Sequence, residues 1–114
     1  MNPCSRLPEF EKEFGRLAAK YRSLPKDIAR LVETLAEYPT GVGVNFTIIN
    51  RYAAVTIVKT RLSCESLRKR SLRLIYAYHT DTKAFVFIEL YFKGDKENED
   101  RERIKTYLKK LDQS

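Results

Sequence analysis

Six basic side chains gather in one short stretch of the sequence, and their type and spacing suit the binding of an anion. They lie within fifteen residues: Lys59, Arg61, Arg68, Lys69, Arg70 and Arg73. The 114-residue chain has a formal net charge of +7, and residues 59–80 contribute +5 of it, with Glu65 as their one acid. Solubility alone does not require such clustering, so the pattern favours a polyanion such as a nucleic-acid backbone.

Two segments rich in β-branched and aromatic residues flank the basic stretch and predict strands: 53–62 and 72–79. The basic loop 63–71 joins them directly, so we expect antiparallel neighbours with this loop at one end of the sheet. Side chains alternate across a strand, which places Lys59 and Arg61 on one face of the first segment. If the leucines beside Arg73 face the core, all three cations point away from it together.

Helical periodicity of apolar residues marks three further segments: 7–21, a second that starts at 23–25 and ends before Pro39, and 98–111. Two more segments predict extended chain: 45–49 and 84–92. We therefore expect an α+β fold in one domain, residues 1–114. In it, an N-terminal antiparallel helical hairpin packs on a three- or four-stranded antiparallel sheet, and a C-terminal helix follows.

Composition excludes several classes of protein. No apolar run approaches the ~20 residues that a membrane span needs, and the N-terminus has no apolar core of a signal peptide. The two cysteines, Cys4 and Cys64, make no disulfide framework and no zinc-ligand spacing. We expect a cytoplasmic protein with no metal, no small-molecule cofactor and no membrane partner.

The stretch VKTRLSCESLRKRSLRLIYAYH, followed by FIELYFKGDKENEDRERI, resembles the RelE/ParE-type toxins of bacterial toxin–antitoxin systems. The resemblance spans roughly residues 7–110. It implies a helical hairpin, an antiparallel sheet and a final helix. The family usually has a strand before the first helix, but here only MNPCSR is available and Pro3 makes it a poor strand.

The RelE branch of this family cleaves mRNA in the ribosomal A site, by attack of a 2′-hydroxyl on the neighbouring phosphate without a metal. By resemblance, Arg61 and Arg73 stabilise the phosphate in the transition state. Lys59 is a candidate general base if neighbouring cations lower its pKa. Lys96, in the turn before the last helix, completes the expected catalytic set. The expected RNA-binding residues are Arg68, Lys69, Arg70, Lys93 and Tyr91.

RelE itself has a tyrosine in its C-terminal segment, and this sequence departs from that pattern. Tyr107 falls on the apolar stripe of the last helix and is expected in the core, which leaves Tyr91 as the candidate for base stacking. His79, the one histidine, is expected as a turn residue at the strand end away from Arg73. Glu89 either orients an arginine or is exposed.

The resemblance implies a cognate antitoxin, the ribosome and mRNA as partners. Two other functions stay open at this point. The ParE branch poisons DNA gyrase by binding it and needs no catalytic cations. A non-catalytic RNA-binding module would use the same basic residues without cleavage.

Overall fold

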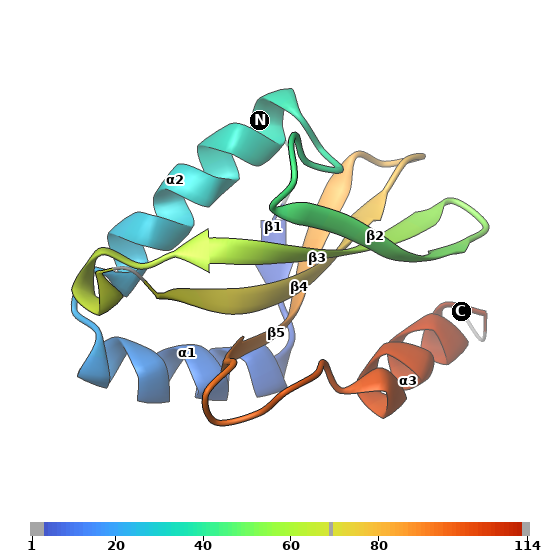
Figure 1. Ribbon diagram of the computed structural model, residues 1–114. Coiled ribbons are helices and arrows are strands. Elements are labelled where there is room, and N and C mark those ends of the chain that lie inside the picture. Colours follow the sequence, from blue (N-terminus) through green and yellow to red (C-terminus); the bar gives the residue numbers. More distant parts are fainter. Residues whose placement is uncertain (1–3, 69, 113–114) are drawn as a thin grey trace.

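The computed structural model describes residues 4–68 and 70–112, and its elements follow the predicted order with one addition at the start. Figure 1 shows their arrangement. The helices are α1 (Pro8–Lys20), α2 (Leu24–Glu37) and α3 (Arg101–Asp112), with the short 3-10 helix η1 (Glu65–Leu67). The strands are β1 (Cys4–Arg6), β2 (Phe46–Tyr52), β3 (Val55–Ser63), β4 (Ser71–His79) and β5 (Ala84–Phe92).

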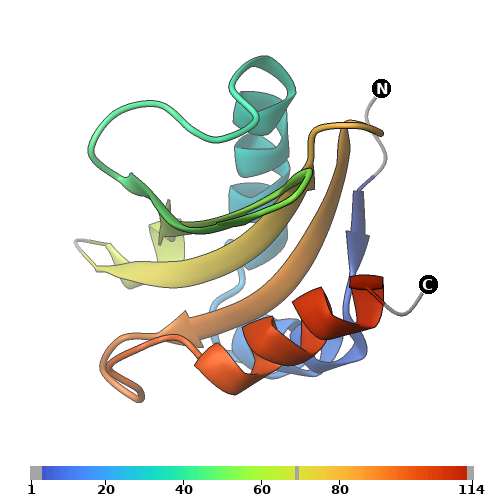
Figure 2. The same cartoon turned by 90° about the vertical axis from the view of Figure 1, so that its right-hand side faces the viewer.

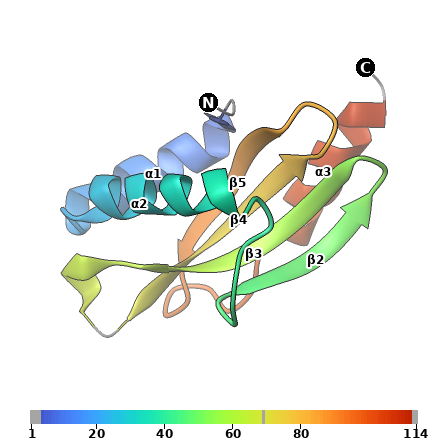
Figure 3. The same ribbon diagram turned by 90° about the horizontal axis from the view of Figure 1, so that it is seen from above.

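The sheet is mixed and five-stranded, in the order β1-β5-β4-β3-β2. The prediction of three or four wholly antiparallel strands was therefore wrong in detail. The difference is β1, which pairs parallel to β5 through three residues and begins at Cys4, one position past the proline that argued against a strand. The remaining neighbours are antiparallel, and β2 forms the edge of the sheet opposite β1 (Figure 3).

One face of the sheet packs against α1 and α2, as predicted. Phe10 and Leu17 of α1 and Ile28 of α2 pack against strand residues such as Leu72 and Leu74. These side chains are almost fully buried. The alternation predicted for 72–79 is thus confirmed, since the leucines and Tyr76 share this face.

The opposite face is covered by α3 over part of its area. Figure 2 shows α2 and α3 on opposite sides of the sheet. Ile104 of α3 packs with Val55, Ile57, Ile75 and Ala77, which lie toward the end of the sheet that carries the β4–β5 turn. The positions that come next on the same face, toward the other end, are Lys59, Arg61 and Arg73. The basic residues therefore lie on the part of this face that α3 does not cover.

The last helix starts at Arg101, three residues later than the predicted 98–111. The Asp100 carboxylate accepts a hydrogen bond from the Arg103 backbone N–H, as an N-cap residue does. Glu99 lies before the cap and bonds to Lys59 of β3. Of the acids expected in the first turn, Glu102 lies there, Asp100 caps the helix, and Glu99 bonds to a distant partner instead. Among the described residues, no helix is long and apolar enough to cross a membrane.

Gly41, in the connection between α2 and β2, supplies a stability test of the fold. Its φ is +91°, and a Cβ there would lie 2.1 Å from Cγ of Phe46. We expect Gly41→Ala to lower the free energy of unfolding by about 2 kcal/mol or more. The matched control is Gly15→Ala on α1, where a Cβ meets nothing within 4 Å.

Because glycine weakens a helix interior, Gly15→Ala should raise the free energy of unfolding by about 0.5–1 kcal/mol. Chemical denaturation of both variants measures the contrast. Equal effects at Gly41 and Gly15 would show that Gly41 does not adopt its left-handed conformation against Phe46 in solution.

Candidate nucleic-acid interface

Arg61 and Arg73 are directly opposed residues of β3 and β4. Opposed residues on neighbouring antiparallel strands have Cβ atoms about 4.5–5.5 Å apart, so the two side chains leave the sheet side by side. Arg61 is exposed and Arg73 is half-buried. The Arg73 guanidinium donates a hydrogen bond to Ser71 Oγ at 2.7 Å, which steadies it near the start of β4.

Two adjoining hollows, of about 480 and 340 Å³, open over this pair. They share Arg61, Arg73 and Lys93, and we call them together the basic hollow. The basic residues of the larger part are Arg61, Arg70, Arg73 and Lys93, and those of the smaller part are Lys59, Arg61, Arg73, Lys93 and Arg101. Among its lining residues Glu99 is the one acid. Such a concentration of guanidinium and ammonium groups attracts phosphate.

The loop between β3 and β4 lies at the same end of the sheet as Arg61 and Arg73, as predicted, because Ser63 and Ser71 pair directly. Reciprocal hydrogen bonds fix it to the joint between α1 and α2. The Ser66 backbone N–H donates to Ser23 Oγ at 2.8 Å, and the Ser23 backbone N–H donates to Ser66 Oγ at 3.0 Å. The loop is thereby held against the helices.

The loop cations differ in their position. Arg70 lines the basic hollow, and its guanidinium carbon lies 5.9 Å from the centre of the Phe92 ring. Arg68 is exposed, has a φ of +56° and lies outside the lining of the hollow. Lys69 lies outside the described residues.

Lys59 is paired with an acid that the sequence did not reveal. Its ammonium donates a hydrogen bond to Glu99 Oε1 at 2.9 Å. Partial burial acts to lower the pKa of Lys59, but interactions with Glu99 and Tyr91 outweigh burial and the pKa is raised. The lowered pKa expected for a general base is therefore not found. Lys59 supplies a positive charge.

Lys96 is also paired. Its ammonium donates to the carboxylate of Glu89, which is fully buried on β5. The other oxygen of Glu89 accepts the Asp100 backbone N–H at 2.8 Å. Glu89 thus orients a lysine and the segment before α3, whereas the sequence predicts an arginine partner or exposure. Lys96 lies outside the lining of the basic hollow.

Tyr91 is opposite Arg73 on β5, but its side chain is only 4% exposed. The Lys96 ammonium lies 5.2 Å from the centre of its ring. Burial raises the pKa of Tyr91, although the Lys59 ammonium acts against it. A nucleobase can stack on Tyr91 only after neighbouring groups move. In this structure Tyr91 is instead a buried residue beneath the cations.

A third ion pair, between Arg103 and Glu13, holds α3 to the rest of the fold. The Arg103 guanidinium bonds to both carboxylate oxygens of Glu13 on α1, each at 2.9 Å, and to the Ile88 carbonyl oxygen at 2.9 Å. Glu13 also accepts the Leu90 backbone N–H at 3.1 Å. These contacts satisfy backbone groups of β5 beyond the end of β1. They fix the helix that carries Arg101.

His79 is at the far end of β4, where its Nε2 shares a hydrogen bond with the Tyr107 hydroxyl. His79 is the last residue of β4, whereas the sequence predicts a turn residue. Tyr107 packs with the core under α3, as predicted, and burial raises its pKa to about 12. Neither residue reaches the basic hollow.

The sequence did not indicate two members of the site, Glu99 and Arg101. Both fall in the acidic run whose pattern is typical of a helical first turn. The turn before this run, KGDKEN, was the signal that the sequence offered. A turn after β5 brings the residues that follow it back toward the sheet and close to β3.

Neither a family model nor a curated protein matches the sequence. The fold is similar to that of a chain in the crystal structure of the archaeal RelE–RelB complex from Pyrococcus horikoshii OT3. The TM-score is 0.61, and the match covers 82% of this chain and 96% of that chain at 16% sequence identity. At this identity the similarity shows the fold, so the chain has a RelE-type fold.

The Lys59–Glu99 pair predicts a dependence on pH. Burial acts to raise the pKa of Glu99, but the hydrogen bond from Lys59, a backbone hydrogen bond and the positive charges of Lys59 and Arg101 together outweigh burial and lower the pKa from the ordinary 4.5. Glu99 therefore stabilises the fold fully above pH 4.5, and this contribution is lost as pH falls through the lower folded value. The contribution of Lys59 is full below its ordinary pKa of 10.5 and is lost as pH rises through the higher folded value.

We expect Lys59→Met to raise the pKa of the Glu99 carboxyl, measured by NMR titration of its side-chain carbon. Lys109→Met, on the exposed side of α3, is the control and should leave that pKa where it is. An unchanged pKa of Glu99 in Lys59→Met would show that the pair does not form in solution.

Proposed function

We propose that this chain is a RelE-type toxin of a toxin–antitoxin pair and acts as a ribosome-dependent endoribonuclease on mRNA. The observation that carries the proposal is the side-by-side placement of Arg61 and Arg73 on two rigid strands, in a hollow rich in basic groups. The RelE-type fold supports the proposal, because the known toxin RelE has the same architecture.

The reaction is attack of the ribose 2′-oxygen on the adjacent phosphorus. The new P–O bond forms as the bond to the 5′-oxygen of the next nucleotide breaks, which leaves a cyclic phosphate and a 5′-hydroxyl. Negative charge grows on the phosphoryl oxygens in the transition state. Arg61 and Arg73 each present a planar set of N–H donors to those oxygens, and strand residues are better fixed than loop residues for that task.

Lys59 acts in this scheme as a cation. Its raised pKa keeps it protonated at neutral pH, so it adds positive charge beside Arg61 and does not remove the 2′-hydroxyl proton. The proton passes to water or to a group of the ribosome, and the departing 5′-oxygen takes up a proton from water or from such a group to become the 5′-hydroxyl. Dependence on the ribosome is consistent with this division of roles, since the chain supplies charge and the assembled complex supplies the base.

A non-catalytic RNA-binding module is the second candidate function. The observation in its favour is that Lys59 and Lys96 are both neutralised by carboxylates, Glu99 and Glu89. The same basic hollow would then bind an RNA backbone without cleavage. RNA cleavage therefore discriminates the two candidates, whereas RNA binding does not.

The antitoxin follows from the toxin assignment. RelE is in complex with RelB in the similar structure. We propose a cognate antitoxin here that neutralises the basic hollow with acidic groups, in competition with RNA. Ribosome and mRNA are the other proposed partners.

Arg73→Ala tests the proposed function. Losing one aligned donor to a developing oxyanion typically costs about 3 kcal/mol, so translation-dependent mRNA cleavage should fall about a hundredfold or more. The free protein should melt at the same temperature or higher, because a repelling charge is removed. Cleavage is measured in a cell-free translation extract, with growth arrest as the second readout.

The matched control is Arg51→Ala, an exposed arginine of β2 outside the basic hollow. It should cleave as the unmodified chain does. A loop variant, Arg68→Ala, should only weaken RNA binding modestly and reduce its salt dependence by about one phosphate contact at most. Full cleavage by a folded Arg73→Ala protein would overturn the nuclease assignment, and DNA damage in place of arrested translation would point to a gyrase-binding toxin.

A further inference from the structure

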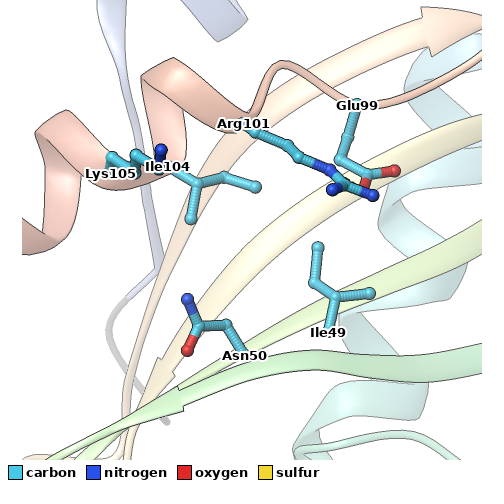
Figure 4. A pocket seen from close by; sticks show the side chains of 6 residues that line it. All are labelled: Ile49, Asn50, Glu99, Arg101, Ile104 and Lys105. Carbon is cyan, nitrogen blue, oxygen red and sulfur yellow. The ribbon is translucent and has the colours of Figure 1, made fainter.

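A third hollow of about 380 Å³ lies between β2 and the first turn of α3. Figure 4 shows its six lining side chains, with Ile49 and Asn50 rising from β2 toward Ile104 of the helix. Ile104 is 5% exposed and Ile49 is half-buried, so the inner wall is apolar. Asn50 is exposed and offers an amide, which donates and accepts hydrogen bonds.

A β-bulge builds this hollow. Ile48 pairs with Val58 and Asn50 pairs with the next residue of β3, Ile57, so Ile49 is the extra residue of β2. Successive side chains of a regular strand point to opposite faces. Here two successive side chains, Ile49 and Asn50, line the same hollow. Bulges of this kind re-aim a side chain and recur beside functional sites.

This third hollow continues into the basic hollow. Ile49, Glu99 and Arg101 line both. The Arg101 guanidinium lies 3.6 Å from a Glu99 carboxylate oxygen and marks the passage between them. A nucleic-acid strand with a phosphate on Arg61 and Arg73 therefore has this third hollow at its side. The hollow offers an apolar inner wall and the Asn50 amide, and the charged side chains of Glu99, Arg101 and Lys105 line the rest of it.

We propose that this hollow binds a nucleobase of single-stranded RNA, next to the phosphate held by Arg61 and Arg73, and that Asn50 reads the edge of that base. The proposal rests on the proposed RNA-binding function. A planar base matches the apolar walls of Ile49 and Ile104. The Asn50 amide meets the donors and acceptors on the base edge, as asparagine does in nucleic-acid recognition. Asn50 would thus set the sequence preference, while Arg61 and Arg73 set the affinity.

A protein ligand fits less well. A peptide backbone in this hollow brings no phosphate for the cations that border it. An acidic side chain of the antitoxin would meet Arg101 but would leave the apolar wall and the amide unused. Occupation by a partner segment is therefore the competing outcome of the test.

The experiment measures binding of short single-stranded RNA homo-oligomers of A, C and U by fluorescence anisotropy. The unmodified chain should prefer one base by about fivefold or more. Asn50→Ala should reduce that preference to within about twofold. Ile48→Ala is the control, because Ile48 precedes the bulge on the same strand and lies outside the hollow. It should retain the full preference.

The side-chain amide signals of Asn50 give a second readout, by NMR during titration with the corresponding nucleoside monophosphates. They should shift most with the preferred base. Equal binding of all three oligomers by the unmodified chain, a preference retained in Asn50→Ala, or unmoved amide signals would each overturn the assignment, and the last would favour a protein segment there.

Arg73→Ala separates this inference from the function on which it rests. It should weaken the binding of all three oligomers by a similar factor and leave the order of their affinities unchanged. If Arg73→Ala leaves RNA binding unchanged, the proposed function itself fails. If Arg73→Ala weakens binding while Asn50→Ala leaves the ranking intact, only the base-binding hollow fails.

Discussion

Like charges on Arg61 and Arg73 repel each other across two hydrogen-bonded strands, and the arrangement around them follows from that repulsion. Opposed like charges destabilise a sheet pair. The strands tolerate the repulsion because their other faces and their other ends are buried, against α1 and α2 on one side and α3 on the other. Since α3 covers only part of its face, the two guanidinium groups stay open to solvent. An anion in the basic hollow would offset the repulsion, and this supports the proposed binding of phosphate there.

Two carboxylates fix the position of the rest of the site, one on β5 and one in the connection between β5 and α3. Glu99 accepts a hydrogen bond from Lys59 of β3, and Glu89 of β5 accepts hydrogen bonds from Lys96 and from the Asp100 backbone N–H. Together they draw the segment between β5 and α3 back to the sheet, so that Lys93 and Arg101 border the hollow. Paired charges with little exposure add little net stability, because desolvation opposes their attraction. Their consequence is a fixed geometry of the donors around the basic hollow, which is the preorganisation that the proposed function requires.

Periodicity predicted much of this structure. The alternation of residues 53–62 and 72–79 was enough to place Lys59, Arg61 and Arg73 on one face, and the short loop was enough to place the 63–71 connection at their end. Pairings between distant segments were not predictable. Glu99 is 40 residues from Lys59 in the sequence, so neither the raised pKa of Lys59 nor the later start of α3 could be seen. The three residues of β1 show no strand period. The sequence did not indicate the burial of Tyr91 either.

The central claim, that Arg61 and Arg73 form an anion site, is tested by the thermal stability of the doubly substituted protein, Arg61→Ala/Arg73→Ala. The measurement is made at low salt, with and without a short single-stranded RNA. The free variant should melt at or above the temperature of the unmodified chain, since the repulsion is gone. RNA should raise the melting temperature of the unmodified chain and leave that of the variant almost unchanged. A free variant that melts well below the unmodified chain, or an equal rise with RNA in both proteins, would contradict the claim.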